Sequence, residues 1–558
     1  MLYANSFFCI SSHCKKRIGL FGLFLFLGAC SFSEKTHVDI KHHKLLIGIT
    51  VDQMRFDYLQ RFDTLFIHPN GFKRLTQQGV NFTQTKYSYF PTYTGPGHAT
   101  IFTGANPKHH GIVGNDWYDK SLGKYVYCVS DTTENTIGSN SGAGQMSPHH
   151  LLVPSIGDYF KEFFGQTAKV YGISLKDRSA ILPTGFNGDA AFWWDGGKQG
   201  KFITSTYYMS QIGEWVDQFN ESGYADRLLE SDWTLSPLLS KLDLDDDLPW
   251  ERPFKGMKAA VFPYELSKLR LINGDYSLLK QVPQGNELIS AFAKKLIENE
   301  QLGLDTIPDF LSLSFSATDY VGHRFGTESL ELVDVYFKLD KVLGDFFSYL
   351  DQKIGRDNYT VFLSSDHGAA PPAGFAMVNL ARGGTVNPLD LELELRNYLQ
   401  NKGLPQTAVR SLINQQIYLD TAISGHQTVE VKKEIISFLK AQPFVEETLD
   451  AVVFSTGISA AYNGRHFNAA KAGYHPKRSG DIFYFLKPNW VEYPEGGSTH
   501  GSFDDWDRHV PFLLWNSSLN RKHINTPIDV VDIAPTVFEI LDFKHPNTFS
   551  GISRYPVK

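Results

Sequence analysis

The stretch VFLSSDHG, residues 361–368, decides how the rest of this chain is interpreted. An apolar run ending at Leu363 has the length of a buried strand, and two serines separate it from Asp366, His367 and Gly368. Adjacent polar side chains at the end of a buried strand are costly unless they have partners. Because carboxylate and imidazole both ligate zinc, the pair indicates either a metal site or an ordinary turn.

Other apolar runs also end on polar residues. They cover residues 44–51, 309–315 and 169–174, and they lead to Asp52, to TDYVGH and to LKDR. Helical patterns lie between the runs, the clearest over 328–350 and a closing one over 530–541. Strands alternating with helices predict an α/β fold with a mostly parallel central sheet flanked by helices. Binding sites in such sheets lie at the carboxyl ends of the strands.

Two long tracts, at residues 183–305 and 373–497, interrupt this alternation. We interpret both as insertions, or cap elements, on one catalytic domain that covers residues 44–558. The first tract contains the acidic stretch LDLDDDLPWERP at 242–253, which we expect to be an exposed loop.

Residues 1–29 have the pattern of a signal peptide. Three basic residues at 15–17 precede an apolar run at 18–28, which is shorter than the ~20 residues that span a bilayer. The four residues up to Cys30 resemble a bacterial lipobox, which favours a lipoprotein over an ordinary secretory signal. Residues 30–43 would then form a tether, and the expected location is the periplasm or the outer membrane.

Composition restricts the function further. Removing residues 1–29 takes away three positive charges and no acidic ones, so the formal net charge changes from −7 to −7 − 3 = −10. A chain this acidic is a poor candidate for general nucleic-acid binding. Cys30 would carry lipid, so only Cys128 keeps a free thiol, and we expect no disulfide within the mature chain.

Six side chains are candidate metal ligands, three aspartates and three histidines. They are Asp52, Asp319, His323, Asp366, His367 and His500. Asp319 and His323 are four residues apart and can share one face of a helical turn. His500 lies in GGSTHGS, where glycines let the backbone approach a site closely. The set suits two divalent ions with three protein ligands each, although any one histidine alone is more simply explained by a structural role.

A candidate nucleophile is Thr94, in YFPTYTGPGHATIFTG. It precedes a predicted helix, where a hydroxyl meets free N–H groups and the positive end of the helix dipole. An N-cap role is the ordinary alternative. Thr92 and His98 compete for the same place, His98 more as a supporting group.

Lys176 and Arg178, in SLKDR, are a candidate charge clamp. Strand alternation would direct both side chains to the same side, where arginine offers a bidentate fork to phosphoryl oxygens and lysine a point charge. Asn115, in GNDWYD, could donate another hydrogen bond. The alternatives are a solvated surface pair or a salt bridge with Asp177.

Seven segments, in order VDQMRFDYL, PTYTGPGHATIFTG, GNDWYD, SLKDR, TDYVGH, SSDHG and STHGS, resemble the alkaline phosphatase superfamily. They are most similar to its bacterial phosphate monoesterases with a threonine nucleophile, over about residues 44 to 541. The resemblance implies two Zn²⁺ ions. One would be bound by Asp52, Asp366, His367 and the Thr94 oxygen, and the other by Asp319, His323 and His500.

The resemblance also implies that Asn115, Lys176 and Arg178 bind the transferred phosphoryl group. It predicts a monomeric alkaline phosphatase that hydrolyses small-molecule phosphate monoesters through a phosphothreonine intermediate, with broad leaving-group tolerance. A phosphodiesterase or nucleotide pyrophosphatase of the same superfamily is the main alternative. A non-catalytic zinc- or phosphate-binding lipoprotein would use the aspartates and histidines but leave Thr94 and the two cations idle.

Overall fold

The computed structural model describes residues 43–242, 244–454, 464–492, 496–544 and 546–555. The predicted signal peptide, Cys30 and all of the predicted tether except His43 lie outside these residues, so the lipid anchor stays a prediction. Within the described residues, no helix combines the length and the apolar character that a bilayer crossing requires.

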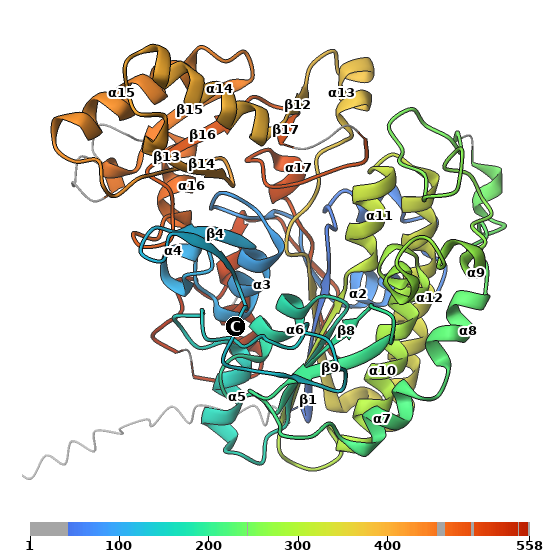
Figure 1. The fold of residues 1–558 in the computed structure, drawn as a ribbon. Helices are drawn as coiled ribbons and strands as arrows, with labels where there is room; N and C mark the ends of the chain where they lie inside the picture. The colour runs from blue at the N-terminus through green and yellow to red at the C-terminus, as the bar shows by residue number, and fades with distance from the viewer. Residues whose placement is uncertain (1–42, 243, 455–463, 493–495, 545, 556–558) are drawn as a thin grey trace, which may run out of the picture. The chain divides into compact units, whose positions relative to one another are not determined.

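A ten-stranded mixed sheet forms the centre of the fold (Figure 1). In spatial order its strands are β19 (Lys522–Ile524), β2 (Val80–Phe82), β18 (Phe512–Trp515), β11 (Tyr359–Ser364), β1 (Leu45–Val51), β10 (Asp309–Phe315), β7 (Val170–Ser174), β8 (Ala190–Asp195), β9 (Lys201–Ser205) and β6 (Thr136–Ile137). The four strands predicted from the sequence, β11, β1, β10 and β7, are adjacent and parallel. The predicted α/β fold is therefore confirmed.

The strand register brings the carboxyl ends of these four strands to one edge of the sheet. Thr50 of β1 pairs with Ser314 of β10 and with Ser364 of β11. Ser314 in turn pairs with Ser174 of β7. The polar segments that follow the strands therefore start side by side.

The central strands are buried on both faces, which explains their continuous apolar sequence. In β1, Leu45, Ile47 and Ile49 belong to one core with helices α10 (Gln284–Glu300) and α12 (Leu330–Leu350). Leu46 belongs to a second core with α3 (Thr94–Thr103), α5 (Ile156–Phe164) and α18 (Ile533–Ile540). The predicted helix at 328–350 is α12, and the one at 530–541 is a short 3₁₀ turn, Val530–Asp532, followed by α18.

The first interrupting tract, 183–305, is not an insertion throughout. Its strands β8 and β9 extend the central sheet, and its helix α10 packs on that sheet. The acidic stretch at 242–253 is exposed at Asp245 and Asp247 but turns inward at its end, where Glu251 is 8% exposed. The stretch is thus mostly exposed, as expected of an exposed loop, with Glu251 as its buried residue among those described.

The second tract, 373–497, contains a separate four-stranded sheet. Its strands, in spatial order, are β13 (Val409–Ile413), β14 (Gln416–Leu419), β16 (Ile482–Leu486) and β15 (Val445–Asp450). Helices α14 (Pro388–Asn401) and α15 (His426–Lys440) share an apolar core with this sheet. The tract is thus built around its own core (Figure 1).

Candidate active site

Two groups of side chains at the carboxyl edge of the sheet could each hold a metal ion. One group is Asp52, Asp366 and His367, and the other is Asp319, His323 and His500. Within each group the ligand atoms lie within 4.8 Å of one another. The structure thus brings together all six side chains that the sequence selects.

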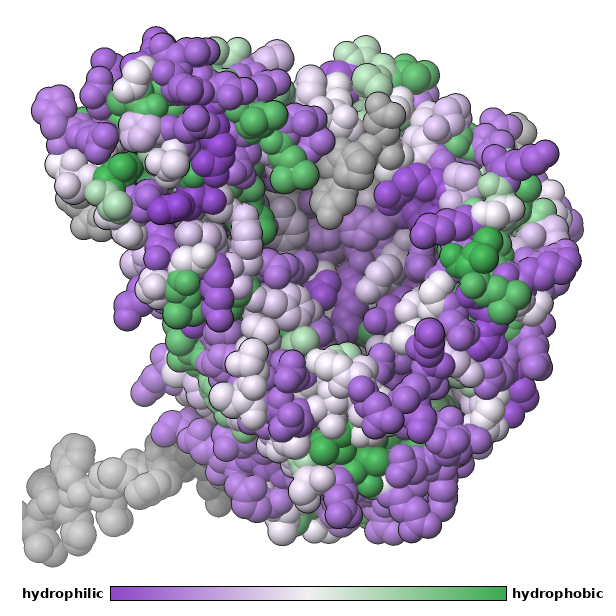
Figure 2. All heavy atoms as spheres, in the orientation of Figure 1, coloured by the Kyte–Doolittle hydropathy of each residue, from purple (hydrophilic) through white to green (hydrophobic). Residues whose placement is uncertain are grey.

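The fold places these residues at three strand ends and in one loop. Asp52 directly follows β1, and the Asp366–His367 pair follows β11. Asp319 and His323 lie four residues apart on α11 (Ala317–Phe325), with Asp319 Oδ1 3.1 Å from His323 Nε2. On the face shown in Figure 2, hydrophilic side chains surround a hollow that lies between the positions of α3 and α11 in Figure 1.

Backbone carbonyls orient all three histidines. His367 Nδ1 lies 2.9 Å from the carbonyl oxygen of Gly368, His323 Nδ1 2.8 Å from that of Ser498, and His500 Nδ1 2.9 Å from that of Thr92. A proton on Nδ1 satisfies each carbonyl and leaves Nε2 free to ligate a metal. Burial lowers the pKa of His367 and, together with the two other histidines, that of His500, which favours the neutral imidazole that a metal requires.

The charges at the site do not balance without a further cation. Asp52, Asp319 and Asp366 are buried, and the ammonium of Lys176 lies 2.7 Å from Asp52 Oδ2 and 2.6 Å from Asp319 Oδ2. Asp52 Oδ1 accepts no hydrogen bond from any described residue. Burial and the neighbouring Asp366 raise the pKa of Asp52 well above its usual range. One ammonium among three buried carboxylates leaves negative charge that bound divalent cations would offset, so the ligand set fits such ions.

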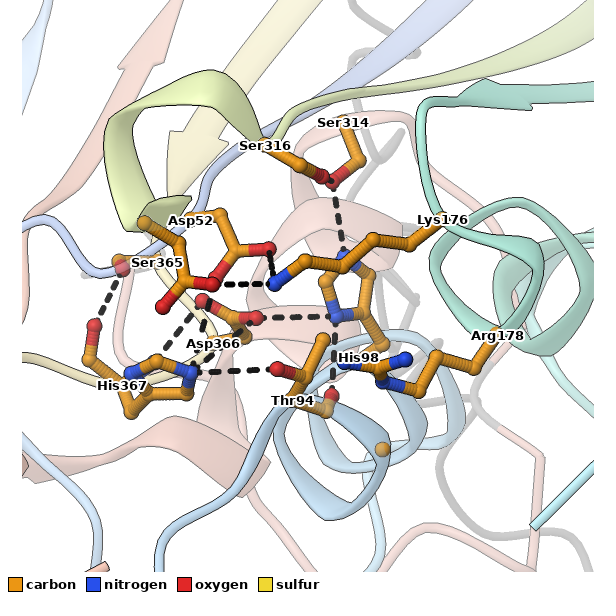
Figure 3. Close-up of polar contacts among 12 residues, drawn as sticks. Asp52, Thr94, His98, Lys176, Arg178, Ser314, Ser316, Ser365, Asp366 and His367 are labelled. Carbon is orange, nitrogen blue, oxygen red and sulfur yellow. Dashed lines mark hydrogen bonds and ion pairs between the residues drawn. The ribbon is translucent and has the colours of Figure 1, made fainter. Parts of the chain in front are cut away.

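The Thr94 hydroxyl faces the first of these groups (Figure 3). Thr94 is the first residue of α3, it is 1% exposed, and its Oγ1 lies 3.3 Å from His367 Nε2. The N-cap of α3 is Tyr93, so the N-cap interpretation of Thr94 is wrong. The hydroxyl is instead available for chemistry.

The two competitors of Thr94 have other partners. The Thr92 hydroxyl donates to the carbonyl oxygen of Ser502, 3.3 Å away. His98 is fully buried, with Nδ1 3.0 Å from the Thr94 carbonyl oxygen and 3.3 Å from Asp366 Oδ2. Its Nε2 lies 3.2 Å from Ser314 Oγ, so His98 joins the start of α3 to the end of two strands, as a supporting group.

Lys176 and Arg178 sit at a strand–helix junction, not on a strand. β7 ends at Ser174 and α6 (Asp177–Thr184) begins at Asp177, so the expected strand alternation is wrong. Lys176 is 4% exposed, which excludes a solvated surface pair. Arg178 Nη1 donates to the Tyr127 hydroxyl at 3.0 Å, while its buried Nε has no hydrogen-bond partner among the described residues. The Arg178 side chain extends toward Thr94 in Figure 3.

Asn115 holds the first turn of α3. Its Oδ1 accepts a hydrogen bond of 2.7 Å from the Gly95 N–H. The amide oxygen is thereby used, which leaves the NH₂ group as the donor available to a bound anion.

Sequence analysis missed Gln53, which contacts both ligand groups. Its backbone N–H donates to Asp366 Oδ1 at 3.2 Å, and its side-chain amide donates to Asp319 Oδ1 at 2.7 Å. The only sequence signal was its position beside Asp52 in VDQMR.

The fold and the two groups of candidate metal ligands together indicate a hydrolase of the alkaline phosphatase superfamily. The family model described as type I phosphodiesterase / nucleotide pyrophosphatase matches residues 46–505, and the chain belongs to this family. The resemblance seen in the sequence is thus confirmed.

Relatives with named activities, one of them with a solved structure, indicate the activity within this family. The chain is 38% identical over 532 residues to alkaline phosphatase PafA of Elizabethkingia meningoseptica, which covers 93% of this chain and 95% of PafA. The PafA crystal structure superimposes with a TM-score of 0.87 at 37% identity, covering 92% of this chain and 98% of PafA. Alkaline phosphatase PhoV of Synechococcus elongatus is 38% identical over 516 residues, 91% of this chain and 92% of PhoV.

A third relative, named calcium-transporting ATPase, is from Myroides odoratus. It is 39% identical over 529 residues, which cover 93% of this chain and 95% of the relative. With several alkaline phosphatases among its relatives, this protein is a hydrolase of phosphate esters.

Proposed function

We propose that the protein hydrolyses phosphate monoesters through a phosphothreonine at Thr94, with two divalent ions, which we take to be Zn²⁺. The observation that carries the proposal is the buried Thr94 hydroxyl, 3.3 Å from His367 Nε2, with the Arg178 side chain extending toward Thr94. The names of PafA and PhoV support hydrolysis of monoesters. Because these contacts address the phosphoryl group alone, we expect broad leaving-group tolerance.

Each of the two ligand groups would bind one ion. Asp52, Asp366 and His367 would hold one ion beside Thr94, and Asp319, His323 and His500 the other. When bound, the ions would offset the buried carboxylates and supply Lewis-acid polarisation of the oxygens at phosphorus.

The residues of the chain perform a two-step transfer. The Thr94 hydroxyl gives up its proton, and its oxygen bonds to phosphorus as the ester P–O bond breaks and the leaving oxygen takes a proton. Water then attacks the phosphothreonine and releases inorganic phosphate and free Thr94. Arg178, Lys176 and the Asn115 amide would bind the non-bridging oxygens in both steps.

A solved structure of a PafA variant supports these roles. That variant carries substitutions of one threonine, one asparagine, one lysine and one arginine. These are the residue types of Thr94, Asn115, Lys176 and Arg178, and they follow the same order along the chain.

A phosphodiesterase is the second candidate, because the family model carries that description. The two cations favour the monoester, since its dianion presents more charge to Lys176 and Arg178 than a diester monoanion does. Comparing p-nitrophenyl phosphate with bis-p-nitrophenyl phosphate separates the two functions: faster diester hydrolysis would overturn the monoesterase proposal.

ATP belongs among the substrates to be tested. Its terminal phosphoryl group carries the same kind of charged non-bridging oxygens as a monoester, and one relative is named an ATPase. We expect ATP hydrolysis to need Thr94, as monoester hydrolysis does.

Substitution of Thr94 tests the mechanism. We expect Thr94→Ala to lower kcat for p-nitrophenyl phosphate by several orders of magnitude while bound zinc persists, and Thr94→Ser to retain part of the activity. Thr92→Ala removes a neighbouring hydroxyl that bonds to the backbone, and is the matched control. Acid-quenched wild type should carry one phosphoryl group on Thr94 by mass spectrometry. Near-native turnover by Thr94→Ala would exclude it as the nucleophile.

A further inference from the structure

We infer that Gln53 is a positioning residue that joins the two metal-ligand groups and sets how tightly Asp319, His323 and His500 bind their ion. The inference rests on the proposed two-ion site. It concerns a side chain that is neutral and touches no reacting atom in that proposal.

Gln53 makes one hydrogen bond to each ligand group. Its backbone N–H lies 3.2 Å from Asp366 Oδ1, and its Nε2 lies 2.7 Å from Asp319 Oδ1. Asp319 Oδ1 is also the oxygen that lies 3.1 Å from His323 Nε2 and 3.9 Å from His500 Nε2. The amide therefore aims the carboxylate oxygen that faces both histidines. Gln53 is 2% exposed, so water does not replace this bond.

The backbone of Gln53 is in an unfavourable conformation that its neighbours enforce. Its φ is +65°, in the left-handed region that residues with a Cβ adopt rarely. The Asp52 N–H is fixed by the Phe315 carbonyl at 3.1 Å, and the Met54 N–H by Ser365 Oγ at 2.8 Å. Glycine would fit this backbone better, so a glutamine here indicates a use for its side chain.

The glycine of TDYVGH supports the same use. Gly322 lies on α11 between Asp319 and His323, and a Cβ added to it would lie 1.9 Å from Gln53 Oε1. The Gln53 amide thus packs directly against the helix that carries two ligands. Gly322 leaves the space that the amide needs.

Two substitutions isolate the side chain. Gln53→Gly keeps the backbone N–H on Asp366 and relieves the positive φ, but removes the bond to Asp319. Gly322→Ala keeps Gln53 but forces its amide away from α11. Loss of a residue that orients a metal ligand typically weakens metal binding 10–100-fold. We expect both variants to bind one of the two zinc ions about 10–100-fold more weakly and the other as in wild type.

Gln301→Gly is the matched control. Gln301 has a φ of +55° and is exposed after the end of α10, so the same substitution occurs at the same kind of backbone without a ligand nearby. It should leave zinc binding unchanged.

The experiment measures bound zinc per full-length chain against free zinc set by a chelator buffer, together with thermal melting. The expected result is a shifted affinity for one ion in Gln53→Gly and Gly322→Ala, with no drop in the melting temperature of zinc-stripped Gln53→Gly. If Gln53→Gly bound zinc with the same affinities as wild type, the inference would be overturned while the two-ion site stands. A lower melting temperature with unchanged zinc affinity would overturn it as well, because Gln53 would then have only a structural role. A wild type that binds fewer than two ions would remove the proposed site itself, and the inference with it.

Discussion

In the proposed mechanism Arg178 would favour monoesters over diesters, and its replacement by alanine gives the sharpest test of that role. The guanidinium is held at one end by the Tyr127 hydroxyl, 3.0 Å from Nη1. Its Nε–H is buried and has no acceptor within the described part of the chain. Arg178→Ala would therefore remove this unpaired donor together with the hydrogen bond to Tyr127, from a side chain that extends toward Thr94.

The size of the effect follows from the bonds that a bound phosphoryl group would lose. A hydrogen bond to a charged group contributes about 1.5–3 kcal/mol, and Arg178 can present Nε and one further N–H as a fork. A loss of about 3 kcal/mol lowers kcat/KM roughly 10²-fold. A diester has one non-bridging oxygen fewer and a single negative charge, so we expect its kcat/KM to fall about 10-fold or less.

The assay compares kcat/KM for p-nitrophenyl phosphate and for bis-p-nitrophenyl phosphate on the same samples, with zinc content measured alongside. Arg410→Ala is the control, because Arg410 is ion-paired with Asp420 at 2.6 Å in the separate four-stranded sheet. Equal losses for both esters would show that Arg178 does not respond to substrate charge. No loss for the monoester would refute the clamp.

Three further perturbations probe packing, pH and metal. Gly97→Ala would place a Cβ 2.1 Å from the Asp366 carbonyl oxygen, so we expect α3 to shift. The shift should lower kcat at least 10²-fold and lower the melting temperature. Wild-type kinetics would contradict this contact. Burial raises the pKa of Glu251 to about 8 from 4.5, so the stability it contributes is present below about pH 4.5 and is lost as the pH rises through 8. Glu251→Gln should therefore raise the melting temperature at about pH 9 but not at about pH 5, and a lower melting temperature at about pH 9 would show that the carboxylate is needed there. Chelation should lower the melting temperature because three buried aspartates lose their counter-charge, and added zinc should restore it; an unchanged melting curve would speak against bound metal.

The central strands and all six candidate metal ligands could be selected from the sequence because burial and chemistry coincide there. A strand buried on both faces must be continuously apolar, so residues 44–51 and 360–363 stand out, and the polar residues that end them need a reason. Parallel strands then bring those ends to one edge, which groups ligands far apart in the chain.

Pairing between distant segments could not be predicted in the same way. β8 and β9 fall within the tract that we interpreted as an insertion, because the local sequence AAFWWD contains no signal that this strand pairs with β7. The junction at SLKDR is similar, since a strand and the first turn of a helix meet within three residues. The contacts of Gln53 could not be predicted, because its partners lie 313 and 266 residues away along the chain and its left-handed backbone has no sequence signature.

The segment around Thr94 contacts both candidate ligand groups, as Gln53 does. The Thr92 carbonyl oxygen orients His500 of one group at 2.9 Å, and the Thr94 hydroxyl meets His367 of the other at 3.3 Å. Gly97 lets the same helix approach the Asp366 backbone. Because residues 92–97 carry all three contacts, movement of Thr94 relative to one group would also change its distance from the other. In the proposed mechanism, the segment that delivers the attacking oxygen would thus also influence the spacing of the two ions.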